Sequence, residues 1–77
     1  MVKAYILILV DGGTLSSVLN EIKKISEIKS VDAVYGPYDL IAVAEASDLD
    51  SLGKFVVTKI QSIKGVNRTL TCPVAKL

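Results

Sequence analysis

The sequence contains no histidine, no tryptophan and a single cysteine, Cys72. A lone cysteine cannot form an intrachain disulfide or, without histidine, a soft-metal site, so we expect no disulfide, no metal and no other cofactor. A chain of 77 residues buries only about 60% of its unfolded surface, and small domains without such links rely on oligomerisation. These absences predict one domain, residues 1–77, that associates with copies of itself.

The chain also carries almost no excess of positive charge. Nine Lys and Arg residues and eight Asp and Glu residues give a formal net charge of +1. Arg68 is the only arginine and the lysines are dispersed, so the basic stripe of a nucleic-acid-binding module is absent. No apolar run reaches the roughly 18 residues of a membrane span, and nothing resembles a signal peptide. We therefore predict a cytoplasmic protein without direct contact to nucleic acid or membrane.

What the chain does contain is hydrophobic patterning in the order strand, helix, strand, strand, helix, strand. Predicted strands cover residues 3–10, 31–35, 40–46 and 66–72, and predicted helices cover about 14–26 and 49–63. Thr14 is the expected N-cap of the first helix, and Ser47 or Asp48 that of the second. The residues from Gly36 to Asp39 are typical of a turn, so the second and third strands should form a hairpin.

An internal repeat favours the same element order. Residues 24–32 match residues 59–67 at a constant offset of 35 positions. Two similar strand–helix–strand halves are typical of the ferredoxin-like α+β fold, βαββαβ, with a four-stranded antiparallel sheet and two helices on one face. Chance similarity between two helix–strand junctions is the alternative explanation of the repeat, and the predicted fold is the same in either case.

The face of the sheet that carries no helix is also expected to be apolar, because the first strand is apolar on both sides. Tyr5, Leu7 and Leu9 alternate there with Ile6, Ile8 and Val10. In the last strand, alternation places Val66, Arg68, Leu70 and Cys72 on one face and the threonines on the other. An open apolar sheet face predicts a dimer that packs sheet to sheet.

Catalytic patterns are weak. The titratable or nucleophilic candidates are Asp11, Asp39, Glu45 and Cys72, and no two of them have a recognisable catalytic spacing. The ferredoxin-like fold hosts many functions, but this chain lacks the paired cysteines of metallochaperones, the aromatic run of RNA-recognition motifs and the loop arginine of acylphosphatases. We expect no enzyme; an enzyme of the dimeric barrel type with a pocket inside the dimer is the remaining catalytic hypothesis.

Two short motifs carry a family resemblance. Residues 34–42, Val-Tyr-Gly-Pro-Tyr-Asp-Leu-Ile-Ala, contain Gly-x-Tyr-Asp, and residues 65–71 read Gly-Val-Asn-Arg-Thr-Leu-Thr. In this order and at this distance they resemble the ligand-binding domain of the Lrp/AsnC transcriptional regulators, also called the RAM domain, over roughly residues 2–74. The chain enters its first strand at once, without room for a helix-turn-helix, and so resembles the stand-alone form with no DNA-binding domain.

The resemblance implies a ferredoxin-like domain that forms dimers, assembles further, commonly into octamers, and binds an amino acid or a related small effector between dimers. The ligand-binding residues that it implies are Tyr35, Gly36, Tyr38, Asp39, Thr69 and Thr71. Many family members carry a polar residue where this chain has Pro37, which has no N–H to offer a ligand.

The chemistry of these residues suits an amino acid. Asp39 can accept from an ammonium group, the threonines can donate or accept, and Gly36 lets backbone approach closely. The same residues also have purely structural explanations. Gly36 and Pro37 can make the turn, Asp39 can cap its own loop, and the threonines can favour the strand. We therefore predict an amino-acid-sensing and oligomerisation domain in transcriptional regulation. The alternative is an assembly module that joins a full-length Lrp/AsnC-type regulator without binding ligand.

Overall fold

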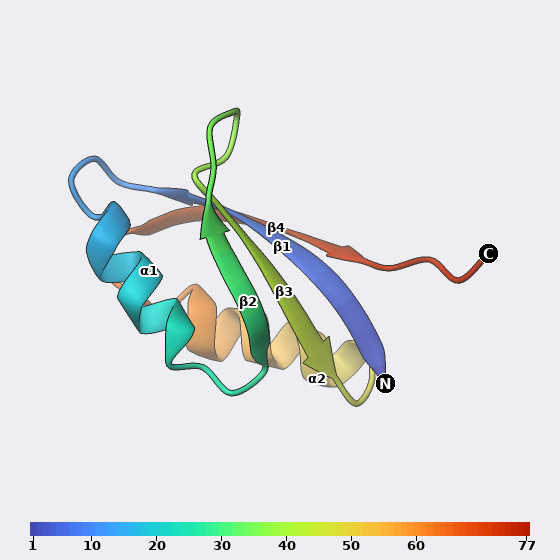
Figure 1. Ribbon diagram of the computed structural model, residues 1–77. Coiled ribbons are helices and arrows are strands. Elements are labelled where there is room, and N and C mark those ends of the chain that lie inside the picture. The colour runs from blue at the N-terminus through green and yellow to red at the C-terminus, as the bar shows by residue number, and fades with distance from the viewer.

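The computed structural model describes residues 1–77 and confirms the predicted βαββαβ order. Figure 1 shows both helices on one side of the sheet. The elements are β1 (Val2–Val10), α1 (Leu15–Lys23), β2 (Ile28–Ala33), β3 (Leu40–Ala46), α2 (Leu49–Phe55), the π-helix η1 (Val56–Ile60) that continues α2, and β4 (Val66–Pro73). Neither helical segment has the length and apolar character needed to cross a membrane.

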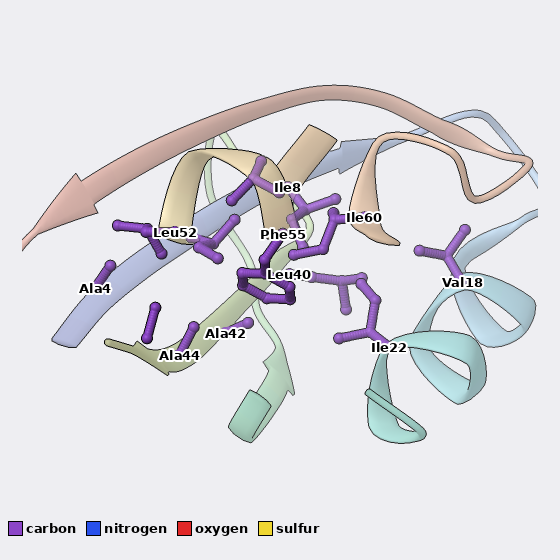
Figure 2. Packing of buried hydrophobic residues seen from close by; sticks show 13 residues of the cluster. Ala4, Ile8, Val18, Ile22, Leu40, Ala42, Ala44, Leu52, Phe55 and Ile60 are labelled. Atoms are coloured by element: carbon purple, nitrogen blue, oxygen red, sulfur yellow. The ribbon is translucent and has the colours of Figure 1, made fainter. Parts of the chain in front are cut away.

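The sheet is antiparallel throughout, in the order β2-β3-β1-β4, so the two most apolar strands are central. Every second residue of β1 and β3, from Ala4 to Ile8 and from Leu40 to Ala46, faces the helices and is buried. Val18 and Ile22 of α1 pack against these residues together with the buried positions of α2 and η1 (Figure 2). The core is therefore a single layer between the sheet and the helices.

The two helices differ in whether the side chain at the N-cap position makes a capping hydrogen bond. Asp48 caps α2 as predicted: its Oδ1 accepts the N–H of Ser51 at 2.7 Å, and this hydrogen bond holds the pKa of the carboxyl below its usual value. Thr14 stands at the predicted N-cap position of α1, but its side chain makes no capping hydrogen bond. Its hydroxyl donates to the carbonyl oxygen of Asp11 at 2.7 Å and makes no bond to the first helical amides.

The largest differences from prediction concern α1, β2 and the second helix. α1 ends at Lys23, before the predicted end at residue 26, and β2 covers Ile28–Ala33 instead of residues 31–35. β2 is an edge strand, and most of its residues are exposed. Its sequence therefore lacks the apolar–polar alternation that identifies a half-buried strand. The second helix changes to π-helical hydrogen bonding at Val56, where Gln61 N–H donates to the Val56 carbonyl at 2.9 Å.

One further position, in β4, differs from prediction. A register shift between Leu9 and Val10 places Val66 against the core, on the opposite face from Arg68, so strict alternation through β4 was wrong. A Cβ at Gly53 of α2 would meet nothing within 4 Å, so no close approach to the sheet requires a glycine there.

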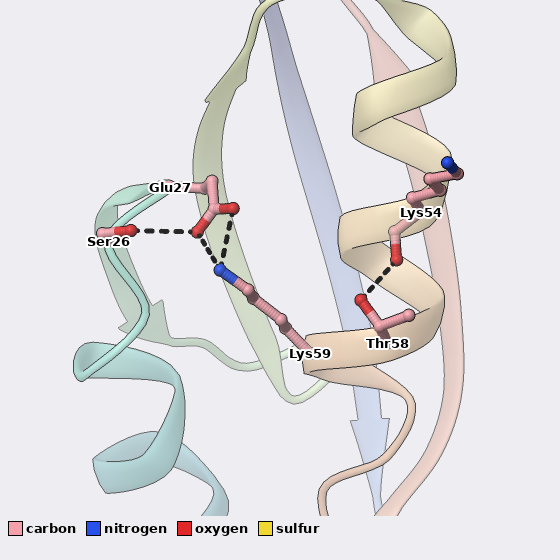
Figure 3. A network of polar contacts seen from close by, with 5 residues as sticks. All are labelled: Ser26, Glu27, Lys54, Thr58 and Lys59. Atoms are coloured by element: carbon pink, nitrogen blue, oxygen red, sulfur yellow. Dashed lines mark hydrogen bonds and ion pairs between the residues drawn. The ribbon is translucent and has the colours of Figure 1, made fainter.

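A small polar network fastens η1 to the connection between α1 and β2. Lys59 Nζ lies 3.0 Å from both carboxylate oxygens of Glu27, and the hydroxyl of Ser26 donates to Oε1 at 3.1 Å (Figure 3). Within the helix, the Thr58 hydroxyl donates to the Lys54 carbonyl at 2.7 Å. The contact between Lys59 and Glu27 joins segments 32 positions apart in the chain.

This network predicts that a small part of the free energy of unfolding is lost in acid. The hydrogen bond from Lys59 lowers the pKa of Glu27 from its ordinary 4.5. The stabilisation is therefore fully present above pH 4.5 and is lost as the pH falls through the lowered pKa of the folded state. Glu27→Gln should lower the free energy of unfolding at pH 7 by less than about 1 kcal/mol, since the pair is partly exposed.

Urea unfolding of both proteins over a pH series measures this effect. The difference between them should shrink towards zero in acid well below pH 4.5. A difference that stays constant across the series would show that the ion pair contributes nothing and that the substitution acts through packing.

Candidate functional site

The connection between β2 and β3 projects beyond the end of the sheet (Figure 1). Gly36 adopts a φ of +142°, a backbone conformation that side chains rarely adopt, and so explains the glycine of the Gly-x-Tyr-Asp motif. Tyr35 is fully exposed at the tip, whereas Tyr38 and Asp39 are half-buried nearer the sheet. The hairpin therefore presents one aromatic side chain to solvent and keeps the other against the sheet.

A hollow of about 260 Å³ lies at the base of this projection. Residues 34–38 form its wall, and Leu7 of β1 and Ile41 of β3 complete the lining. Leu7 and Ile41 are direct cross-strand partners and alternate with core residues, so the hollow opens on the helix-free face of the sheet. We call it the hairpin hollow.

Asp39 ties the hairpin to the end of β1. Its Oδ2 accepts the N–H of Val10 at 3.0 Å, its own N–H donates to the Ile8 carbonyl at 3.0 Å, and its carbonyl accepts the N–H of Val34 at 2.9 Å. The second carboxylate oxygen, Oδ1, has no hydrogen-bond donor within the chain. One half of the carboxylate therefore holds the fold together, and the other half can accept a further donor.

Thr69 and Thr71 lie on the other face of the sheet. They pair with Ile8 and Ile6, whose side chains are buried under the helices, so the threonines also point to the helix side. Thr69 Oγ1 accepts from Gln61 Nε2 at 2.9 Å. It lines a separate hollow of about 310 Å³ with Gln61 and the start of β4.

The structure thus brings together some of the predicted ligand-binding residues and separates others. Tyr35, Gly36 and Tyr38 share the hairpin hollow, and Asp39 adjoins Tyr38 in the chain. Within one chain Thr69 and Thr71 reach neither the hollow nor Asp39, because β1 separates β4 from β3 and the side chains face opposite ways.

Three residues that line these two hollows, Leu7, Ile41 and Gln61, were not among the predicted ligand-binding residues. Leu7 and Ile41 could have been found from strand alternation, which already placed Leu7 on the face opposite Ile6 and Ile8. Gln61 carried no such signal, because its contact with Thr69 depends on the π-helical turn that positions its side chain beside β4.

The sequence model of the family described as the Lrp/AsnC ligand binding domain matches residues 3–76. A Pyrococcus furiosus protein described as an uncharacterized HTH-type transcriptional regulator is 35% identical over 71 residues, which are 88% of this chain and 47% of that protein. The chain thus spans about half the length of the curated relatives that it matches.

Two solved structures show the same architecture. A protein from Thermus thermophilus superposes with a TM-score of 0.94 at 31% identity, over 100% of this chain and 96% of that one. A transcriptional regulator from Neisseria meningitidis, solved as a complex with L-Met, superposes with a TM-score of 0.89 over 97% of this chain and 50% of that one. At 22% identity its likeness concerns the fold. The chain therefore belongs to the Lrp/AsnC ligand-binding domain family of transcriptional regulators.

Proposed function

We propose that this domain binds a free amino acid at the hairpin and couples binding to its assembly with other copies, as a non-catalytic part of transcriptional regulation. The observation that carries the proposal is the carboxylate of Asp39, which follows Tyr38 of the hairpin in the chain and has one oxygen on Val10 and the other without a donor in the chain. Oδ1 can accept from the ammonium group of a ligand while Oδ2 stays on Val10. The Neisseria meningitidis relative in complex with L-Met supports the same ligand class.

Thr69 and Thr71 enter this proposal as residues of a neighbouring copy. They face away from the hairpin of their own chain, so they contribute to the same site only if a second copy brings its β4 to the hairpin. Binding would then favour the assembled state by its difference in affinity for the two states. This arrangement makes sensing and assembly two aspects of one equilibrium.

We further propose that two copies pack through their helix-free sheet faces, with higher oligomers built from such dimers. On this face Tyr5 and Leu70 are 41% and 47% exposed, and Leu9 and Val43 are half-buried. Apolar side chains that share one face of a sheet are more stable when a second layer removes them from water.

Isothermal titration calorimetry against the twenty amino acids, with the wild type and Asp39→Asn, tests the ligand proposal. The asparagine keeps an oxygen acceptor for Val10 N–H but removes the charge, so the fold should persist while affinity falls by at least about tenfold. Asp39→Ala removes both functions and should also weaken the fold. Silence of the wild type at millimolar concentration of every amino acid would contradict the proposal.

A second candidate function is an assembly module that joins a full-length Lrp/AsnC-type regulator without binding ligand. The engagement of Asp39 with Val10 and the missing N–H of Pro37 favour it, since both reduce the groups available to a ligand. Native mass spectrometry of the chain mixed with such a regulator tests it. Mixed oligomers together with calorimetric silence would support the module, whereas ligand binding without mixed oligomers would exclude it.

A further inference from the structure

The hollow beside Thr69, which we call the β4 hollow, carries a positive charge without a carboxylate. Its lining consists of Gln61 and the four residues at the start of β4, from Val66 to Thr69. Arg68 belongs to this lining and forms no ion pair within the chain. Three of the other hollows include a glutamate in their lining, and the hairpin hollow includes no charged residue. The β4 hollow is therefore the one whose charge favours an anion.

Gln61 and Thr69 also supply hydrogen-bond donors to this hollow. Nε2 of Gln61 donates to Oγ1 of Thr69 at 2.9 Å. Because Oγ1 accepts in this bond, the hydroxyl hydrogen of Thr69 remains to donate, and Nε2 keeps a second N–H. The carboxylate of Asp11 adjoins the hollow, but its Oδ1 already accepts from Nδ2 of Asn67 at 3.0 Å. Gln61 and Thr69 therefore present two free donors beside a positive charge.

From this arrangement we infer that Gln61 is a further ligand-binding residue, which together with Thr69 recognises the carboxylate group of an amino acid held between two copies. The inference rests on the proposed function, in which Asp39 of one copy accepts from the ammonium group. A carboxylate needs donors, and Pro37 of the hairpin has no N–H to provide one. The β4 hollow of the second copy supplies the donors that the hairpin lacks.

The charges of the two surfaces are complementary. The hairpin contributes the carboxylate of Asp39, and the lining of the β4 hollow contributes Arg68. An amino acid between them, with its ammonium group towards Asp39 and its carboxylate towards Gln61, meets an opposite charge or a donor at each end. Within one chain the hairpin and the β4 hollow lie apart, because β1 separates β3 from β4. Neither surface alone satisfies both ends of the ligand, so binding requires the assembled state.

Calorimetry with Gln61→Glu tests the inference on the full chain. The glutamate accepts from the Thr69 hydroxyl, so the contact within the chain persists while both donors are lost and a negative charge faces the ligand carboxylate. Every amino acid that binds to the wild type should bind about ten- to hundredfold more weakly, because all share the α-carboxylate. Asn20→Asp is the matched control. It makes the same change from amide to carboxylate on the exposed side of α1, outside every hollow, and should leave affinity unchanged.

An analogue and two variants of Thr69 locate the effect at the carboxylate. The wild type should bind each such amino acid at least about tenfold more tightly than its α-carboxamide, which has no negative charge. Gln61→Glu should narrow or reverse this preference, because the glutamate accepts from the carboxamide N–H. Thr69→Val should weaken amino-acid binding as Gln61→Glu does, whereas Thr69→Ser, which keeps the hydroxyl, should retain it. Circular dichroism of each variant shows whether its fold is intact.

The outcomes separate the inference from the function beneath it. Amino acids that bind to Gln61→Glu as tightly as to the wild type, with the Asp39→Asn effect retained, would overturn the role of Gln61 and leave amino-acid sensing in place. An equal loss for the amino acid and its carboxamide would show that the substitution acts on folding or assembly and would also overturn the inference. No binding of any amino acid to the wild type would overturn both the inference and the proposed function.

Discussion

Replacement of Gly65 by alanine should lower the free energy of unfolding by about 2–4 kcal/mol, a large part of the stability of a domain of this size. Gly65 has a φ of +105°, where a Cβ is strained, and it lies where the start of β4 passes the start of α1. A Cβ there would stand 2.8 Å from Thr14 Cβ and Oγ1 and 3.0 Å from Val18 Cγ2. Val18 is fully buried, so the crowding cannot be relieved by moving into solvent.

Thermal and urea unfolding measure this effect, and the melting temperature should fall by about 10 °C or more. Gly12→Ala is the matched control, because a Cβ at Gly12 meets nothing within 4 Å and its φ is not positive. Adding Thr14→Gly to Gly65→Ala should restore part of the loss by removing the nearest atoms. Equal stability of Gly65→Ala and Gly12→Ala would contradict the close approach.

The other large effect concerns assembly. Val43→Glu should convert the proposed sheet-to-sheet dimer into a monomer of 8.2 kDa, with dimer affinity reduced by about a thousandfold or more. Val43 lies on β3, opposite Tyr5 of β1 and Ser30 of β2, on the helix-free face. A carboxylate there would be buried between two sheets without a partner, which costs several kcal/mol. In a monomer the same carboxylate remains in water.

Light scattering and sedimentation over a range of concentrations test this expectation. Val57→Glu is the control, since Val57 is 59% exposed on the helical layer and takes no part in the proposed interface. It should leave the oligomeric mass unchanged. A wild type that is already monomeric, or a Val43→Glu protein that keeps the wild-type mass, would contradict dimerisation through this face.

Much of the fold could be predicted because burial leaves a local pattern. β3 begins and ends at the predicted residues, Leu40 and Ala46, since a strand at the centre of a sheet is apolar along its length. Asp48 was identifiable as a cap because a capping side chain binds amides only a few residues ahead. The bounds of edge strand β2, predicted at residues 31–35, were wrong for the opposite reason, because most of its exposed residues are polar and follow no alternation.

The candidate site was predictable only in part. The hairpin residues lie together because they are adjacent in sequence, and their motif marks them. The face on which Thr69 and Thr71 lie relative to the hairpin follows from strand order and from the pairing of β4 with β1, neither of which leaves a trace within β4 itself. Whether these threonines join the hairpin in a site between copies stays a prediction.

The sequence by itself determined the order of the elements, the family and the apolar character of both sheet faces, because each depends on residue types at short, regular spacing. Only the tertiary structure decided that one carboxylate oxygen of Asp39 binds the N–H of Val10 while the other has no donor within the chain, and that Gly65 must be glycine because Thr14 lies against it. These contacts join residues 29 and 51 positions apart. They depend on the register of the strands and the approach of distant segments, which local sequence patterns do not encode.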